Sequence, residues 1–352
     1  MNKRMILYIQ GAILLIESAI MVLPIATALI YREPAGVWFF YTALAAAICG
    51  FAAMKLSKPR TKTIYAKEGL ITVALGWIVL SLVGALPFTL SGEIPFYLDA
   101  VFEMISGFTT TGSSILPNVE ALSRCMLLWR SFSHWLGGMG ILVFMLAIVK
   151  MEGGQGIHLL HAESPGPTVG KMVPRMVDSS KILYTIYFAL TLVQVVFYLA
   201  GGMPLFDSLC NAFATAGTGG FSIKADSFAS YSPYLQTVTT VFMALFGVNF
   251  SIYFFLLQKK FDLAFKNTEL RWYVGIILFS IAMITANILP MYPDFHTAIH
   301  HAAFSVSSVI TTTGFGTENF DLWPEFSRVI LVFLMIIGAS AGSTGGGLKV
   351  SR

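Results

Sequence analysis

Long apolar stretches alternate with short polar segments along almost the whole chain. Each is close to the roughly 20 residues that an α-helix needs to cross the hydrocarbon core of a bilayer. The stretches run over Ile6–Ile30, Val37–Met54, Leu70–Leu90, Met126–Val149, Ile182–Ala200, Leu235–Leu257, Trp272–Met291 and Phe326–Leu348. The pattern predicts an all-α polytopic membrane protein.

Three shorter segments interrupt this pattern and align with one another without gaps. Each is a short helix-forming segment followed by a run of Thr and Gly that ends in Gly, and each lies between two apolar stretches. The runs are Thr109-Thr110-Thr111-Gly112, Gly217-Thr218-Gly219-Gly220 and Thr311-Thr312-Thr313-Gly314. A helix too short to cross a bilayer, followed by such a turn, is typical of a re-entrant pore loop. Its repetition indicates several loops around one axis.

These residue types suit a filter for a cation. An ion that leaves water needs oxygen atoms in place of its hydration shell, and rings of backbone carbonyls supply them without a fixed charge. Gly reaches the positive φ that such a turn requires, and neighbouring Thr residues can hold the turn with their hydroxyls. The preceding helices, predicted over Asp99–Phe108, Asp207–Ala216 and His301–Ile310, would direct their negative C-terminal ends at the axis.

The repeated pattern divides the chain into units of span, pore helix, filter turn and span around a central pore. We expect a two-helix N-terminal extension over residues 1–68 and pore repeats over residues 69–150, 182–258 and 272–352. Most of the 22 Lys and Arg residues fall on one side of this arrangement. By the positive-inside bias, that side and the N-terminus are cytoplasmic, and the three turns open to the outside.

The last apolar stretch is interrupted by a run of small residues, Gly338–Gly347. It begins about 18 Å along a helix that starts near Phe326, just past the middle of a core about 30 Å thick. Unwound backbone at this depth is tolerated only where it lines a cavity or is buried in protein. Too few residues separate this run from Gly314 for a fourth filter, so we expect a gating loop on the cytoplasmic side of the filter. Its residues are Gly338, Ser340, Gly342, Ser343, Thr344, Gly345, Gly346, Gly347 and Lys349.

Composition agrees with a membrane protein. Hydrophobic residues make up 56% of the 352 and charged residues 11%, and the mean hydropathy is +0.75, which argues against a soluble globule. The three cysteines have no metal-ligand spacing, so neither a disulfide framework nor a zinc site is expected. The net charge of +4 is spread by membrane side rather than gathered into one patch, so we expect no nucleic-acid partner.

Two groups of polar residues allow more than one interpretation. Arg130 lies inside an apolar stretch, where an unpaired charge is costly. It either pairs with Glu103 of the first pore helix and supports the filter, or snorkels to the outer interface. His296, His300 and His301 resemble a metal cluster, but we favour a polar entry to the third pore helix.

Together these motifs resemble the membrane subunit of Trk/Ktr-type potassium transporters. The matching segments are Thr109–Ser114, Thr215–Ser222, Thr311–Gly316 and Ala341–Lys349, and the similarity covers the whole chain. The resemblance implies four span–pore–span units, a homodimer in the bacterial inner membrane, and a cytosolic nucleotide-binding regulatory subunit (TrkA- or KtrA-like). It also implies K⁺ as the transported ion, no organic cofactor, and Gly112, Gly220 and Gly314 as the key filter glycines.

The chain departs from the family pattern at its end. It stops at Arg352, just after the Gly-rich run, so the fourth pore repeat is absent. We expect a partial version of a longer protein, which by itself would not conduct selectively.

Two alternatives remain. A sodium-permeable cation channel of the same fold would use the same pore. An intramembrane serine hydrolase would use Ser340 of Gly338-Ala339-Ser340-Ala341-Gly342, which matches G-x-S-x-G, with His134 from another span. That nucleophile needs a strand-to-helix turn, and a hydrolase gives no reason for three filter-like repeats, so we expect a transporter and not an enzyme.

Overall fold

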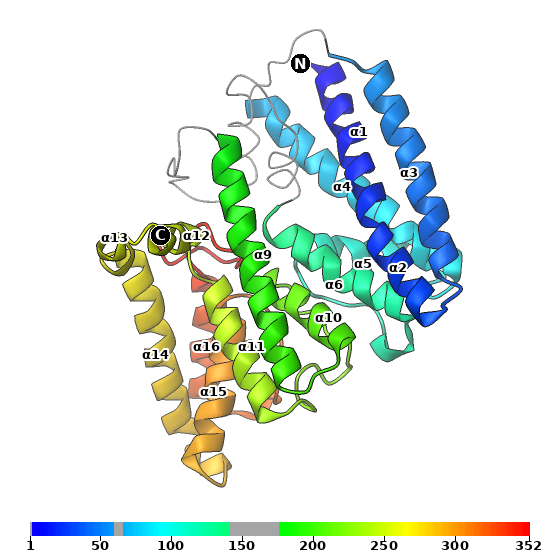
Figure 1. Ribbon diagram of the computed structural model, residues 1–352. Helices are drawn as coiled ribbons and strands as arrows, with labels where there is room; N and C mark the ends of the chain where they lie inside the picture. Colours follow the sequence, from blue (N-terminus) through cyan, green and yellow to red (C-terminus); the bar gives the residue numbers. More distant parts are fainter. Residues whose placement is uncertain (1, 60–65, 141–175) are drawn as a thin grey trace. The chain divides into compact units, whose positions relative to one another are not determined.

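The computed structural model describes residues 2–59, 66–140 and 176–352 (Figure 1). It forms two compact units, Met1–Tyr184 and Thr185–Arg352. Every regular element in the described ranges is helical, and the predicted all-α fold class is confirmed.

The first unit begins with three helices in the region where the sequence predicts a two-helix extension. α1 (Lys3–Ile20) is followed by α2 (Val22–Tyr31), and α3 (Gly36–Leu56) returns beside them (Figure 1). Gly11 and Gly50 bring α1 and α3 close together, because a Cβ on either glycine would lie 2.7 Å from the carbonyl oxygen of the other. Small residues permit this kind of approach between helices in a membrane.

The remaining helices of this unit surround a short one. α4 (Ala66–Ser91) and α6 (Arg124–Gly138) both pack against α5 (Tyr97–Phe108). α5 has 12 residues and is therefore about 18 Å long, too short to cross a bilayer. The predicted span Met126–Val149 runs past residue 140 and so partly outside the described residues.

The second unit contains most of α9 and all later elements. These helices are α9 (Met176–Ala200), α10 (Leu205–Ala216), α11 (Pro233–Phe246), α12 (Phe250–Leu257), α13 (Phe261–Phe265), α14 (Thr268–Ile288), α15 (Phe295–Ile310) and α16 (Glu325–Ile337). α10 and α15 end directly before the second and third Thr/Gly runs, as α5 does before the first.

The predicted span over Leu235–Leu257 is not one continuous helix. α11 and α12 are bent by 90° at a short break between Phe246 and Phe250. Asn249 caps α12, because its Oδ1 accepts a hydrogen bond from the Ser251 N–H at 2.9 Å. The apolar residues on both sides of the break outweighed Gly247 and Asn249, which mark it in the sequence.

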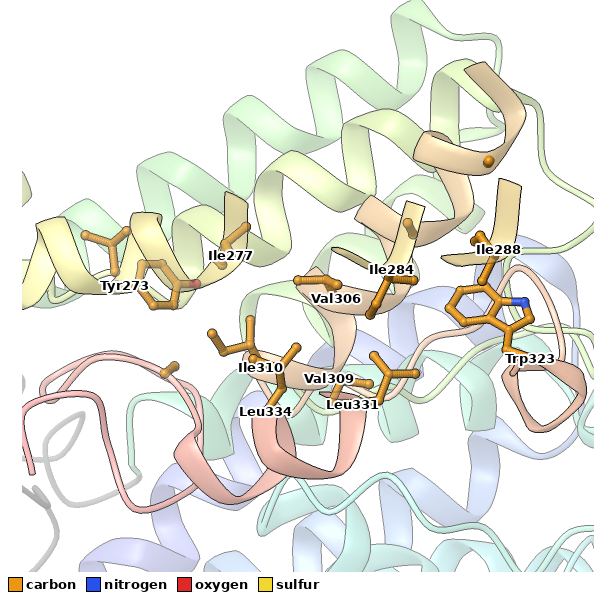
Figure 2. Packing of buried hydrophobic residues seen from close by; sticks show 14 of the residues in the cluster. Tyr273, Ile277, Ile284, Ile288, Val306, Val309, Ile310, Trp323, Leu331 and Leu334 are labelled. Atoms are coloured by element: carbon orange, nitrogen blue, oxygen red, sulfur yellow. The ribbon is translucent and has the colours of Figure 1, made fainter. Parts of the chain in front are cut away.

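An apolar core joins the last three long helices of the second unit. Four residues of α14 belong to this core, and Figure 2 shows their side chains spaced along the helix, with those of α15 and α16 opposite Ile284. The labelled members are Tyr273, Ile277, Ile284, Ile288, Val306, Val309, Ile310, Trp323, Leu331 and Leu334.

The outer faces of the long helices are apolar as well. Five described helices are long and apolar enough to cross a membrane, or six if the bent pair α11–α12 counts as one span. Only 28 to 39% of the residues in these spans are buried within the protein. A helix that is hydrophobic on its exposed side requires an apolar surrounding, so the chain is a multi-pass membrane protein.

Candidate functional site

The three Thr/Gly turns have the same backbone conformation. In each turn the second residue and the final glycine have positive φ. The values are 55° at Thr110, 51° at Thr218 and 59° at Thr312, with 76° at Gly112, 81° at Gly220 and 89° at Gly314. The positive φ of the glycines agrees with what a carbonyl-lined turn requires. The positive φ of the threonines was not predicted, because a β-branched residue rarely adopts it.

The same hydrogen bonds close all three helix ends. The third residue of each turn donates its N–H to the carbonyl five residues earlier, from Thr111 to Ser106, from Gly219 to Ala214 and from Thr313 to Ser308, at 2.8 to 2.9 Å. This is the pattern of a Schellman motif, which usually has Gly at the left-handed position. Here Thr occupies that position three times.

Threonine hydroxyls brace the first and third turns from within. Thr109 and Thr111 join their Oγ1 atoms at 2.8 Å, and Thr311 and Thr313 do so at 2.7 Å. The second turn has Gly at both positions and cannot form this pair. In that turn the Thr218 hydroxyl donates to the Gly217 carbonyl at 2.7 Å.

The second and third turns lie against each other. A Cβ built on Gly220 would be 2.0 Å from the Thr313 carbonyl oxygen, so no side chain fits there without displacing the neighbouring turn. The segments that follow are also joined, since Phe228 N–H donates to the Gly316 carbonyl at 3.0 Å and Gly316 N–H to Ser227 Oγ at 3.1 Å. Two of the three predicted filter turns are therefore neighbours within one compact unit. The first turn belongs to the other unit.

A buried ion pair stands behind the first turn. The Arg130 guanidinium on α6 donates to the Glu103 carboxylate on α5, with Nη2 2.6 Å and Nε 2.7 Å from Oε1. The side chains are 2% and 0% exposed, so Arg130 pairs with Glu103 and does not snorkel. Glu103 also accepts hydrogen bonds from Ser114 Oγ at 2.9 Å and Ile115 N–H at 3.1 Å. The pair thus joins two helices to the segment that leaves the turn.

The third pore helix begins earlier than predicted. The sequence suggested His301 as its first residue, but α15 starts at Phe295 because the Asp294 carboxylate accepts the Thr297 N–H at 2.7 Å. This backbone hydrogen bond lowers the pKa of Asp294. His300 and His301 contact Gln236 and Thr317, at 2.6 and 3.0 Å. No group of three metal-ligating side chains occurs within the described ranges.

The Gly-rich run leaves α16 and folds back on it. Gly338 has a φ of 72° and ends the helix. Ala339 N–H then donates to the Gly346 carbonyl at 3.3 Å, and Lys349 N–H to the Ile337 carbonyl at 2.9 Å. The run is therefore an ordered loop whose two ends lie side by side.

The middle of this loop occupies the break between α11 and α12. Ser340 N–H donates to the Gly247 carbonyl at 3.1 Å, and Thr344 N–H to the Phe246 carbonyl at 3.4 Å. The two irregular segments thus satisfy each other's backbone groups, as unwound chain within a membrane requires.

The far end of the loop touches the third filter turn. Gly346 N–H donates to Thr312 Oγ1 at 2.7 Å, and that hydroxyl donates to the Thr311 carbonyl at 2.6 Å. A Cβ on Gly345 would lie 2.9 Å from the same carbonyl oxygen. Lys349 is buried and donates from Nζ to the Gly345 carbonyl. Its charge is thus directed at the loop itself.

The residues of the hydrolase alternative lie in other surroundings. Ser340 follows the irregular end of α16 and not a strand, as a nucleophile elbow would require. His134 Nδ1 lies 2.7 Å from the Gly107 carbonyl oxygen at the end of the first pore helix. His134 thus lies beside the end of α5, and Ser340 lies beside the break between α11 and α12.

Comparison with known proteins gives one consistent result. The sequence model of the family TrkH, described as cation transport protein, matches residues 38–352. The Trk system potassium uptake protein TrkH of Escherichia coli K12 is 36% identical, over 100% of this chain and 74% of that protein. An uncharacterized cation transporter of Methanocaldococcus jannaschii is 32% identical, over 99% of this chain and 70% of that protein. The crystal structure of the potassium transporter TrkH from Vibrio parahaemolyticus matches with a TM-score of 0.87 and 32% identity, covering 100% of this chain and 74% of that one.

Proposed function

Since the chain belongs to the TrkH family of cation transport proteins, we propose that it carries potassium ions into the cell through its Thr/Gly turns. Its relatives include proteins named for potassium uptake. We place it in the bacterial inner membrane with a cytoplasmic N-terminus, because Lys and Arg gather on that side. Membership of a transporter family supports transport rather than the serine hydrolase alternative.

The observation that carries the proposal is the common backbone of the three turns. Alternation between ordinary and left-handed φ turns successive carbonyls out of the helical direction, and such carbonyls can replace the water around a potassium ion. The C-terminal ends of α5, α10 and α15 add a negative potential, which favours cations. The ion-binding residues are then Thr109–Gly112, Gly217–Gly220 and Thr311–Gly314.

Two further roles follow from this assignment. The loop Gly338–Lys349 acts as the gate, because it contacts a filter turn at Thr311 and Thr312. Glu103 and Arg130 support the first turn through Ser114 and Ile115.

The names of the relatives also bear on the partners of this protein. The name Trk system, carried by several relatives, supports a complex with further components. We propose a homodimer and a cytosolic nucleotide-binding regulatory subunit, which would contact the basic connection around Lys259–Lys266. No such partner is needed for the filter chemistry itself.

Substituting the filter glycines tests the ion assignment. Gly220→Ser places a Cβ on a residue with a φ of 81° and brings it against the Thr313 carbonyl oxygen. Gly314→Ser carries similar backbone strain, at a φ of 89°, but its Cβ has no atom within 4 Å. Strain of about 1–3 kcal/mol per residue corresponds to roughly five- to 140-fold in an equilibrium constant. In proteoliposomes of the complete four-repeat protein, we expect both variants to reduce the ratio of potassium to sodium uptake, and Gly220→Ser to reduce it more.

A matched control is Gly202→Ser. Gly202 has a φ of 82° with open space around its Cβ position and lies outside the three turns, so the variant carries the same backbone strain without touching the filter. Its ion discrimination should equal that of the wild type. Unchanged discrimination in Gly220→Ser would disprove the filter assignment, and equal uptake of both ions by the wild type would favour the sodium-permeable alternative.

A further inference from the structure

The tip of the Gly-rich loop contacts the first turn of α14. Ala341 N–H donates to Glu269 Oε1 at 2.6 Å, across 72 positions of sequence. The next carbonyl, that of Gly342, accepts the Phe250 N–H at 3.0 Å. The tip is therefore held from one side by a carboxylate and from the other by the start of α12.

Asn249 fixes the other oxygen of this carboxylate. Its Oδ1 accepts the Ser251 N–H at 2.9 Å, so its amide nitrogen must be the group that lies 3.5 Å from Glu269 Oε2. A Cβ on Gly342 would lie 3.2 Å from Asn249 Oδ1, so the tip also packs against this amide. Glu269 is thus oriented toward the loop by a residue that caps a neighbouring helix.

The contact at Glu269 differs in kind from the others at the tip. The hydrogen bonds from the Ser340 and Thr344 N–H groups to carbonyls at the C-terminal end of α11 join uncharged backbone groups. A hydrogen bond to an ionised carboxylate is shorter and roughly twice as strong as a neutral one. Glu269 is also a side chain, so this contact can be removed without changing the backbone.

The opposite end of the loop contacts the third Thr/Gly turn. Gly346 N–H reaches Thr312 Oγ1, and this hydroxyl donates to the Thr311 carbonyl. A loop held at Ala341 therefore keeps Gly345 and Gly346 against the third filter turn. We propose that Glu269 is a positioning residue that latches the Gly-rich loop against this turn. The proposal rests on the gating role given to the loop above.

The place of Glu269 in the chain connects the latch to the cytoplasmic side. Asn267 caps α14 by accepting the Leu270 N–H at 2.9 Å, which puts Glu269 in the first turn of that helix. The preceding connection carries Lys259, Lys260 and Lys266, which the positive-inside bias places in the cytoplasm. A force on this connection would move the carboxylate away from Ala341.

Removal of the carboxylate tests the latch. We expect Glu269→Ala to release the tip, and Glu269→Gln, which keeps an acceptor but not the charge, to release it less. Asp262→Ala is the matched control, because Asp262 is an exposed carboxylate on the same connection and pairs only weakly with Lys266 at 3.5 Å.

Release is measured by thiol accessibility as well as by flux. The background is Cys49→Ser, in which the remaining cysteines, Cys125 and Cys210, are buried. In this background Ser343→Cys at the tip is labelled from the cytoplasmic side with a membrane-impermeant maleimide. We expect Glu269→Ala to raise the labelling rate and the basal potassium flux about tenfold, the effect of one charge-assisted hydrogen bond. Asp262→Ala should change neither.

The outcomes separate the latch from the gate. Unchanged labelling in both Glu269 variants, with elution as an intact protein on size exclusion, overturns the latch. Deletion of Ser340–Gly346 in the complete four-repeat protein tests the gate directly and should raise basal flux. If that deletion leaves the flux unchanged while Glu269→Ala still raises labelling, the latch stands and the gating role is wrong.

Discussion

Threonine with left-handed backbone is the costly residue of each filter turn. Thr110, Thr218 and Thr312 have φ between 51° and 59°, which costs about 1–3 kcal/mol for a non-glycine residue. Glycine would remove this strain, but it would also remove the hydroxyl. At Thr312 that hydroxyl joins the Gly346 N–H to the Thr311 carbonyl, so the strained residue is the one through which the loop contacts the third Thr/Gly turn.

The ion pair behind the first turn permits a prediction for a single residue. Glu103→Gln leaves the Arg130 guanidinium buried without its counter-charge. Removal of one partner of a buried pair costs about 3–5 kcal/mol. We therefore expect a clear fall in the thermal unfolding temperature of the detergent-solubilised protein.

The double variant Glu103→Gln/Arg130→Met is the control. With both charges removed, no unpaired ion remains, so it should be more stable than Glu103→Gln alone. Losses that simply add in the double variant would mean that the two side chains do not act as a pair.

Sequence patterns predicted the conformation of some residues in the turns and missed that of others. The glycine that ends each turn could be predicted, since its φ is one that Gly adopts without cost. The sequence could not choose between pairing and snorkelling for Arg130, because that depends on which helix lies beside it. The left-handed threonines contradict local preference, and only the surrounding packing stabilises them.

At the scale of the helix, the ends were predicted better than the beginnings. All three pore helices stop where the Thr/Gly runs start, because the runs themselves form the helix ends. The early start of α15 had a signal in Asp294, a preferred capping residue. The break between α11 and α12 had weaker signals in Gly247 and Asn249, which the apolar residues on both sides outweighed.

Close packing against a pore helix gives a prediction for α6. A Cβ on Gly137 would lie 2.1 Å from the Phe108 carbonyl oxygen, at the end of α5. Since this neighbour is backbone, Gly137→Ala must displace the pore helix. We expect a loss of about 1–3 kcal/mol of stability, as for other overpacked sites, together with impaired selectivity of the first turn.

Gly275→Ala provides the comparison. Gly275 lies inside α14 and has nothing within 4 Å of its Cβ position. Alanine favours a helix over glycine by up to about 1 kcal/mol, so this variant should unfold at the same temperature as the wild type or higher. A Gly137→Ala protein as stable and selective as Gly275→Ala would show that α5 does not depend on the close approach of α6.

At the scale of the whole molecule, the distribution of apolar and charged residues determines the environment. Trp272, Leu278 and Phe279 of α14 are 61 to 67% exposed, while Tyr273 and Ile284 of the same helix are buried. The comparisons confirm the family membership inferred from the turns. Apolar residues on both faces of the helices made the spans easy to predict from the sequence. The same property hides contacts between helices, since a lipid-facing and a protein-facing leucine look alike in a sequence.

The orientation of the second unit in the membrane follows from α14 and the charges at its ends. The apolar segment Thr268–Met291 has 24 residues and is therefore about 36 Å long, enough to separate its ends by a bilayer. Lys266 precedes it, and Asp321 follows the third filter turn on the far side. The positive-inside bias places Lys266 in the cytoplasm and Asp321 outside.

In intact cells with the Cys49→Ser background, we expect an impermeant maleimide to label Asp321→Cys but not Lys266→Cys. Permeabilised cells, in which both sides are accessible, should show labelling of both. Labelling of Lys266→Cys in intact cells would reverse the orientation and place the Gly-rich loop on the outer side of the filter.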